Sequence, residues 1–165
     1  MILGMSAATY TLLHVLISLI GIGSGFMAMY GFLTSRRWDG MNAIFLIATV
    51  LTSVTGFGFP FEHLLPAHKV AMISLVALAV AIAARYIFHM VGGSRKVYVI
   101  TSAIALYLNV FVFVAQAFLK QPTLHALAPE GKEPPFLGAQ IMVMVIFIVL
   151  TAFAVKKFHP EPAHA

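Results

Sequence analysis

Imidazole side chains are the groups in this sequence best suited to chemistry. The chain contains seven histidines and no cysteine, which excludes disulfides, thiolate metal sites and cysteine nucleophiles. Imidazole nitrogens bind zinc, copper and haem iron, and two imidazoles from different helices at equal depth can hold a haem b. Four histidines lie in or beside apolar segments at the same expected side of a membrane: His14, His63, His68 and His125. These residues are the candidate ligands for haem b or a divalent metal ion.

The spacing of the histidines leaves other roles open. No two histidines lie four residues apart, and no HExxH motif occurs, so no single helix offers a preformed metal site. His14 lies inside an apolar segment, where polar side chains form hydrogen bonds between helices. Histidines in loops are commonly solvated. A metal or haem site and a structural role for His14 are therefore alternatives.

A second polar group falls near the opposite end of the same predicted helices. Arg85 and His89 are one helical turn apart within an apolar segment, where ionisable groups are costly. Together they could bind an anionic lipid headgroup or a quinone carbonyl. The alternative is that Arg85 extends its side chain to the lipid phosphates while His89 lies in the headgroup layer.

The composition is that of an integral membrane protein. Apolar residues make up 61% of the 165 residues, charged residues make up 9%, and the mean hydropathy is +0.99. Soluble domains are about 25% charged. The net charge of +5 comes from cations at the ends of apolar runs, a pattern typical of membrane orientation and not of nucleic-acid binding. We therefore expect the lipid bilayer as a partner and no nucleic acid.

Five apolar segments are long enough to cross a bilayer, because about 20 helical residues span its hydrocarbon core. They cover residues 9–33, 41–59, 68–91, 97–119 and 136–158. Lipid offers no partners for backbone N–H and C=O groups, so each segment is expected to be helical. The predicted fold is all-α, an integral membrane bundle of five transmembrane helices. Residues 1–158 are expected to form this domain and the proline-rich residues 159–165 a flexible tail.

Cations in the connections predict the orientation of the bundle. Six of them fall on one side of a five-helix path: Arg36, Arg37, Arg95, Lys96, Lys156 and Lys157. The other side receives Lys69, Lys120 and Lys132. Because basic residues are enriched in cytoplasmic connections, we expect the N-terminus outside and the C-terminus in the cytoplasm. The four candidate histidines then belong to the outer half of the bundle.

Small and weakly polar residues mark the faces along which the helices pack, because close backbone approach drives helix association in lipid. In the first helix they recur at steps of three and four: Thr11, His14, Ser18, Gly21 and Gly25. This stripe places His14 on the packed face. Short connections at 35–40 and 92–96 make the helices that they join antiparallel neighbours. Prolines around 123–128 favour one helical turn on the membrane surface.

Several short runs resemble those of a known group of proteins. They are residues 53–61, Leu65-Pro66-Ala67-His68, Ala84-Arg85-Tyr86, residues 105–112, residues 116–120 and Glu133-Pro134-Pro135-Phe136. On these runs the chain resembles an uncharacterised group of small multi-pass membrane proteins of proteobacteria. The resemblance covers most of the chain from the second helix onward. It implies a protein of the bacterial inner membrane and supplies no activity, cofactor or catalytic residue.

Two functions from different classes are compatible with these patterns. The first is a non-catalytic accessory or structural membrane component that offers its outer connections to another membrane protein or to a second copy of the chain. The second is a redox or metal-handling membrane protein that binds haem b or a transition metal through the outer-side histidines. The sequence has no P-loop, no GxSxG motif and no intramembrane carboxylate pair. We therefore assign no catalytic residue and favour the first function.

Overall fold

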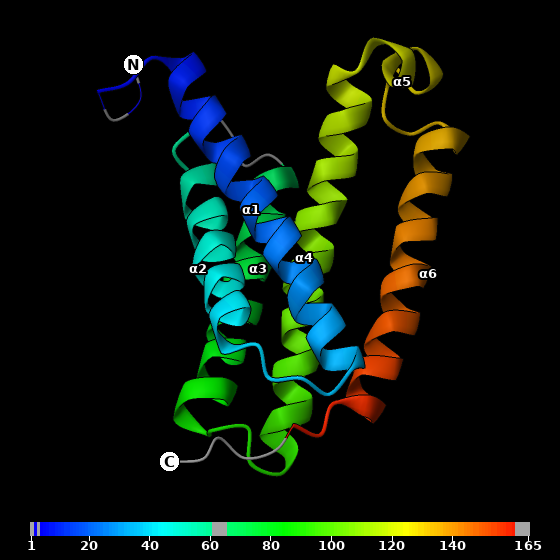
Figure 1. The fold of residues 1–165 in the computed structure, drawn as a ribbon. Coiled ribbons are helices and arrows are strands. Elements are labelled where there is room, and N and C mark those ends of the chain that lie inside the picture. The colour runs from blue at the N-terminus through cyan, green and yellow to red at the C-terminus, as the bar shows by residue number, and fades with distance from the viewer. Residues whose placement is uncertain (1, 3, 61–65, 161–165) are drawn as a thin grey trace.

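The computed structural model describes residues 2, 4–60 and 66–160, and this part of the chain is helical and contains no β-strand (Figure 1). Five of its helices are long and apolar enough to cross a membrane. They are α1 (Ala7–Leu33), α2 (Asp39–Gly56), α3 (Pro66–Ile82) with the π-helix η1 (Ala83–Ile87), α4 (Gly93–Lys120) and α6 (Pro134–Lys157). The predicted all-α bundle of five transmembrane helices is confirmed, and the protein is a multi-pass membrane protein.

Two helix boundaries differ from the predicted ones and bring new residues into the bundle. α2 begins at Asp39, ahead of the predicted residue 41, so a carboxylate lies in its first turn. The sequence predicts an α-helix up to residue 91, but the third segment widens into η1, where the Phe88 N–H donates to the Ala83 carbonyl at 2.9 Å. His89 and Met90 then adopt positive φ angles of 49° and 56°, and the chain turns toward α4.

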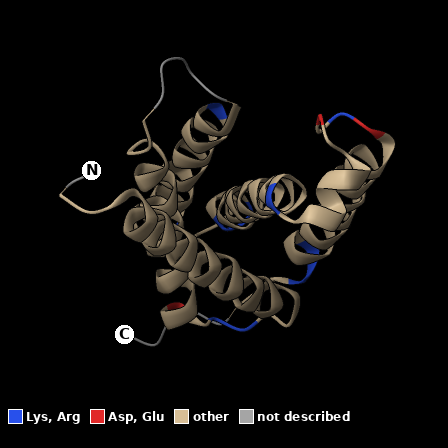
Figure 2. Cartoon of the chain, turned by 90° about the horizontal axis from the view of Figure 1, so that it is seen from above, with Lys and Arg blue, Asp and Glu red and all other residues tan. Residues whose placement is uncertain are grey.

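α4 is the central helix of the bundle and contacts α1, α2, α3 and α6. Figure 2 looks down the bundle and shows neighbouring helices on several sides of α4. The pairs α1–α2 and α3–α4 are antiparallel neighbours, as their short connections predict. Residues of α4 can therefore take part in any site inside the bundle.

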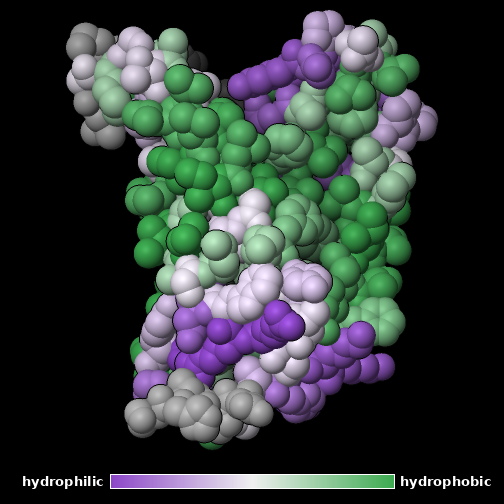
Figure 3. Space-filling view, viewed as in Figure 1, coloured by the Kyte–Doolittle hydropathy of each residue, from purple (hydrophilic) through white to green (hydrophobic). Residues whose placement is uncertain are grey.

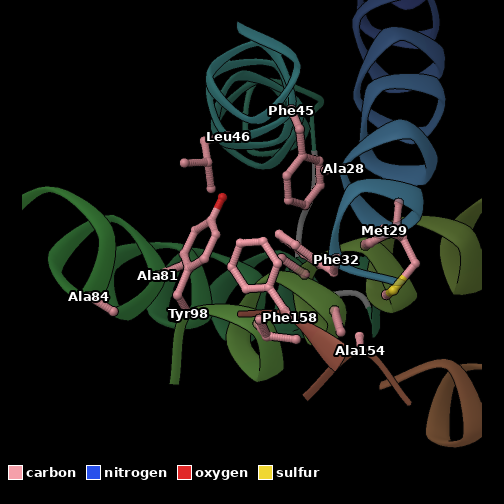
Figure 4. Close-up of a cluster of buried hydrophobic side chains, with 14 of the residues drawn as sticks. Ala28, Met29, Phe32, Phe45, Leu46, Ala81, Ala84, Tyr98, Ala154 and Phe158 are labelled. Carbon is pink, nitrogen blue, oxygen red and sulfur yellow. The ribbon is translucent and has the colours of Figure 1, made fainter. Parts of the chain in front are cut away.

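One end of the bundle is packed more tightly than the other. We call the closed end the one with the connections 34–38 and 88–92 and the last turn of α6, and the open end the opposite one, beside α5. A buried cluster fills the closed half with side chains from α1, α2, α3, η1, α4 and the end of α6 (Figure 4). Phe32 lies at its centre, with its ring centroid 5.6 Å from Tyr98 and 4.9 Å from Phe158, both edge-on. This packing holds five helices together at one end.

Polar contacts also join the segments of the closed end. Ser35 Oγ accepts a hydrogen bond from the His159 N–H at 2.8 Å, and the Arg95 guanidinium donates to the Phe158 carbonyl. The connection after α1, the start of α4 and the end of α6 therefore meet. The six cations predicted on one side, at 36–37, 95–96 and 156–157, accordingly share one end of the bundle.

A short helix, α5 (Pro122–Leu127), joins α4 to α6 at the open end and matches the helical turn predicted there. Glu133 orders the following turn, because its two carboxylate oxygens accept hydrogen bonds from the backbone N–H groups of Glu130 and Lys132, each at 2.9 Å. These bonds, the one from Glu130 first, hold the pKa of Glu133 below its ordinary value. The turn thus prefers an ionised carboxylate.

Apolar side chains cover the outside of the bundle between its two ends (Figure 3). On α6, Ile141, Ile148 and Phe153 are more than half exposed. Exposure of such side chains to water is unfavourable by about 1.5–3 kcal/mol each, whereas lipid chains accommodate them. Hydrophilic residues gather toward the two ends in the same view. The apolar band is therefore the surface that faces the bilayer.

Candidate functional site

A cavity of about 570 Å³ lies at the open end between α1 and α4. The two helices approach closely near Gly25, where an added Cβ would lie 2.5 Å from Leu106 Cδ1, and they diverge toward the open end (Figure 1). Most of the lining is apolar, and its residues on α1 and α4 are Thr11, His14, Val15, Ser18, Leu19, Ile22, Asn109, Val112, Phe113, Gln116, Ala117 and Lys120. Thr52, Gly56, Phe59, Ala67 and His68, from α2, the following turn and α3, and Gln121, which follows α4, complete it.

His14 is held in one orientation on the wall of this cavity. Its Nδ1 lies 2.8 Å from Thr55 Oγ1 on α2, and its ring stands edge-on to Phe59 with centroids 5.2 Å apart. Tyr10, one turn earlier on α1, donates to the Thr55 carbonyl at 2.8 Å and also packs edge-on against Phe59. The predicted inward position of His14 is confirmed, and α2 provides its hydrogen-bond partner.

The hydrogen bonds of Thr55 determine which His14 nitrogen carries a proton. Thr55 Oγ1 lies 2.7 Å from the Leu51 carbonyl, and this contact needs the hydroxyl proton because a carbonyl has none. Thr55 then has no second proton for His14, so its oxygen accepts from the His14 Nδ1–H. A neutral His14 ring therefore carries its proton on Nδ1 and has an unprotonated Nε2, which can accept a hydrogen bond or bind a metal.

A smaller cavity of about 80 Å³ continues the main one into the space between α2, α3 and α4. It shares His14 and Asn109 with the main cavity and adds Ser53 from α2 and Ser74 from α3. Both serines are buried. The inner wall of the combined cavity therefore carries polar side chains from α1, α2, α3 and α4.

Gly21 makes room for polar groups at the deep end of the cavity. A Cβ on this residue would lie 3.2 Å from both Asn109 Nδ2 and Thr49 Oγ1. These two buried atoms have no hydrogen-bond partner among the described residues. Buried polar atoms usually have a partner, in many cases an ordered water molecule. The glycine thus lets an amide from α4 approach α1 and α2 in mid-bundle.

The other histidines predicted as ligands are distributed unevenly around the cavity. His68 is buried, lines the cavity with His14, and lies beside Phe57 with ring centroids 5.5 Å apart. His125 is exposed on α5 and does not line the cavity. His63 lies outside the described residues. Within residues 2, 4–60 and 66–160, no group of three or more metal-binding side chains is assembled.

Arg85 belongs to a separate polar cluster toward the closed end. Its side chain is only 3% exposed and pairs with Asp39, which also accepts from Arg37 Nε at 3.0 Å. The guanidinium carbon lies 5.1 Å from the ring centroid of Tyr98, whose hydroxyl donates to Asn42 Oδ1. This arrangement contradicts the interpretation that Arg85 extends to the lipid phosphates, because its charge is directed to a carboxylate at the start of α2.

His89 is exposed in the turn after η1, whereas Arg85 is buried. The lipid or quinone contact predicted for these two residues stays a prediction. Sequence reasoning missed Asp39 because it precedes the apolar run, and it did not assign Ser53 or Ser74 to a site because isolated serines are common in membrane helices. A polar side chain on the packed face of a helix is the sequence pattern that could have indicated these residues.

No family model matches the chain, and no curated protein or solved structure matches it either. The function is therefore inferred from the fold and the cavity. Together they define a helical multi-pass membrane protein with a ligand-sized, mostly apolar cavity at one end.

Proposed function

We propose that this protein is a non-catalytic component of the membrane that binds a small lipophilic molecule in the cavity at its open end. The observation that carries the proposal is the cavity of about 570 Å³ between α1 and α4. Ligand sites are typically apolar hollows of about 300–1,000 Å³ with a few convergent polar groups. The described lining residues have this character, since they combine aliphatic and aromatic side chains with hydroxyl, amide and imidazole groups and the ammonium group of Lys120.

The cavity is suited to a molecule that arrives from the bilayer. Val15 and Leu19 on α1 and Phe113 on α4 line it and are themselves 39%, 44% and 51% exposed. The rim between these helices is therefore apolar and belongs to the lipid-facing surface. A lipophilic molecule can cross such a rim without passing through water.

Photochemical labelling tests this function. The protein in lipid nanodiscs is titrated with an alkyl diazirine and irradiated, and the labelled residues are mapped by mass spectrometry. We expect saturable labelling on Ile22 and Val112, which line the cavity and are half-buried, and labelling of Ile148 on α6 that rises without saturation because Ile148 faces lipid.

Two matched variants locate the saturable site. Ala117→Phe places a ring at a residue that lines the cavity and should abolish the saturable labelling. Ala152→Phe places the same ring on the exposed face of α6 and should leave it intact. Labelling of the cavity residues that never saturates, or that survives Ala117→Phe unchanged, would contradict the proposal.

A second candidate function is redox or metal handling with haem b or a transition metal. The observation that favours it is that His14 and His68 line the same cavity. The hydrogen bond from His14 Nδ1 to Thr55 resembles the contacts that orient metal-bound imidazoles. Dithionite difference spectra of the purified protein test it, and a Soret band that is lost in His14→Ala is the expected result. Absence of that band, together with no stoichiometric metal by elemental analysis, would contradict this candidate.

We further propose that the protein resides in the bacterial inner membrane with the N-terminus outside and the closed end in the cytoplasm. Support comes from the six cations gathered at the closed end, against Lys69, Lys120 and Lys132 toward the open end. Another membrane protein or a second copy of the chain then has access to α5 from the outer side.

A further inference from the structure

The inner wall of the cavity carries two serine hydroxyl groups that make no side-chain hydrogen bond to the described residues. Ser53 and Ser74 are 5% and 4% exposed. Within residues 2, 4–60 and 66–160, neither hydroxyl forms a side-chain hydrogen bond. Both line the smaller cavity, on α2 and α3 respectively. Buried hydroxyls are normally hydrogen-bonded, so these two are available to a guest molecule or to water.

His14 adds an acceptor to the same wall. Its Nδ1–H is engaged with Thr55, and its unprotonated Nε2 needs a proton donor. His14 lines both the main and the smaller cavity, so it lies where the two spaces join. A guest molecule that forms hydrogen bonds with all of these groups must donate one to His14 Nε2 and accept one from a serine hydroxyl.

The polarity of the cavity also gives the direction in which an elongated guest lies. The lateral rim between α1 and α4 is apolar at Val15, Leu19 and Phe113, and the deep wall on α2 and α3 carries Ser53 and Ser74. Gln116, Lys120 and Gln121 line the cavity at the open end. An amphiphile with its chain at the rim and its polar group at the deep wall matches both surfaces. The reverse orientation would bury an apolar chain against the unpaired hydroxyls.

We propose that the cavity selects lipophilic molecules with a hydroxyl head, such as alkylphenols, hydroquinones or long-chain alcohols, and binds them with the hydroxyl against His14, Ser53 and Ser74. This inference rests on the proposed function and specifies its ligand class. A hydroxyl group donates one hydrogen bond and accepts up to two, whereas the corresponding methyl ether only accepts. The ether therefore leaves His14 Nε2 unpaired.

Histidine NMR tests the acceptor directly in the ligand-free protein. Protein labelled with ¹⁵N-histidine is placed in nanodiscs, and the His14 ring signals are identified by their loss in His14→Gln. We expect the ring to carry its proton on Nδ1 and to show an unprotonated Nε2. A ring protonated on Nε2 alone would overturn the inference.

Paired probes then test the head group. 4-Octylphenol and 4-octylanisole differ only in the hydroxyl and its methyl ether, and 1-dodecanol distinguishes a general alcohol site from a phenol site. We expect the phenol to bind about tenfold more tightly than the anisole and to shift the His14 Nε2 signal. Dodecanol binding with the same shift assigns the site to alcohols in general, and phenol binding alone assigns it to phenols and hydroquinones; both results support the hydroxyl head.

Serine variants test whether the preference for a hydroxyl head group depends on Ser53 and Ser74. Ser53→Ala and Ser74→Ala should each reduce the phenol-to-anisole ratio, while Ser24→Ala should not, because Ser24 is a buried serine of α1 that bonds to the Ile20 carbonyl away from the cavity. Equal binding of phenol and anisole to the unmodified protein would overturn the hydroxyl preference and leave the proposed function standing. Binding of neither probe, with no saturable diazirine labelling, would overturn both.

Discussion

The absence of a Cβ atom at Gly25 allows α1 to approach α4 closely. Gly25 is buried, and a Cβ there would lie 2.5 Å from Leu106 Cδ1 and 2.9 Å from Phe45 Cδ2. Leu106 and Phe45 are each about 1% exposed and belong to the buried cluster, so neither can move without displacing others. The glycine is therefore required for the contact below the cavity.

We predict that Gly25→Ala lowers the free energy of unfolding by about 1–3 kcal/mol, because it overpacks a filled interior. Thermal unfolding in detergent micelles, followed by circular dichroism, measures the change. Gly23→Ala is the matched control on the same helix, since nothing lies within 4 Å of a Cβ at that exposed position. Equal stability of the two variants would show that α1 and α4 do not meet at Gly25.

His14 shows how much a residue's role depends on its neighbours. The helical stripe of small and polar residues already predicts that its side chain faces the bundle. Thr55 makes it an acceptor, through a hydroxyl whose own proton is committed to the Leu51 carbonyl. The sequence spacing of Thr55 and His14 contains no sign of this pairing.

The π-helix η1 is the element that brings a buried cation to a carboxylate on another helix. Arg85 on η1 is 3% exposed, and its partner Asp39 at the start of α2 is 58% exposed. A π-helix inserts an additional residue into a helical turn and changes the direction of the side chains beside it. The ion pair thereby joins the third transmembrane segment to α2 near the closed end.

We predict that Asp39→Asn lowers the free energy of unfolding by about 1–3 kcal/mol, because it leaves the buried Arg85 charge without its partner. The loss should be smaller than the about 3–5 kcal/mol typical of a fully buried pair, since Asp39 is half exposed to solvent. Chemical unfolding in detergent provides the measurement.

Arg37→Gln is the control for this element, because it removes a more exposed partner of the same carboxylate. Its effect should stay below about 1 kcal/mol. A loss for Arg37→Gln as large as that for Asp39→Asn would show that the buried Arg85 does not depend on Asp39.

At the scale of the whole molecule, the two ends differ in packing and in charge. The closed end has the buried cluster around Phe32 and the six cations, and the open end has the cavity and α5. An asymmetric distribution of basic residues orients a membrane protein during insertion. The closed end should accordingly face the cytoplasm.

We predict that a cysteine at the open end is accessible from outside the cell and one at the closed end is not. The chain has no native cysteine, so Thr123→Cys on α5 and Gly93→Cys at the start of α4 each give a single site. A membrane-impermeant maleimide should label Thr123→Cys in intact cells and Gly93→Cys only after lysis. The opposite pattern of labelling would reverse the orientation.

Local sequence information determined the class and the number of helices. The length of each apolar run predicts the five transmembrane helices, because lipid offers backbone N–H and C=O groups no hydrogen-bond partner outside their own helix. Short connections predict the antiparallel pairs, and the position of each cation in an alternating path predicts that six of them share one end. These properties depend on residues close together in the chain and on the solvent, so they can be read without the fold.

The cavity and its chemistry were decided by the tertiary structure. Whether α1 and α4 touch or diverge depends on the crossing of two helices near Gly25, and whether Ser53, Ser74 and His14 share a space depends on the rotation of three helices about their axes. The interpretation that Arg85 extends to the lipid phosphates is wrong, because its buried side chain on η1 pairs with Asp39 at the start of α2. Such contacts join residues far apart in the sequence, and hydropathy and residue spacing do not determine which residues of two helices meet.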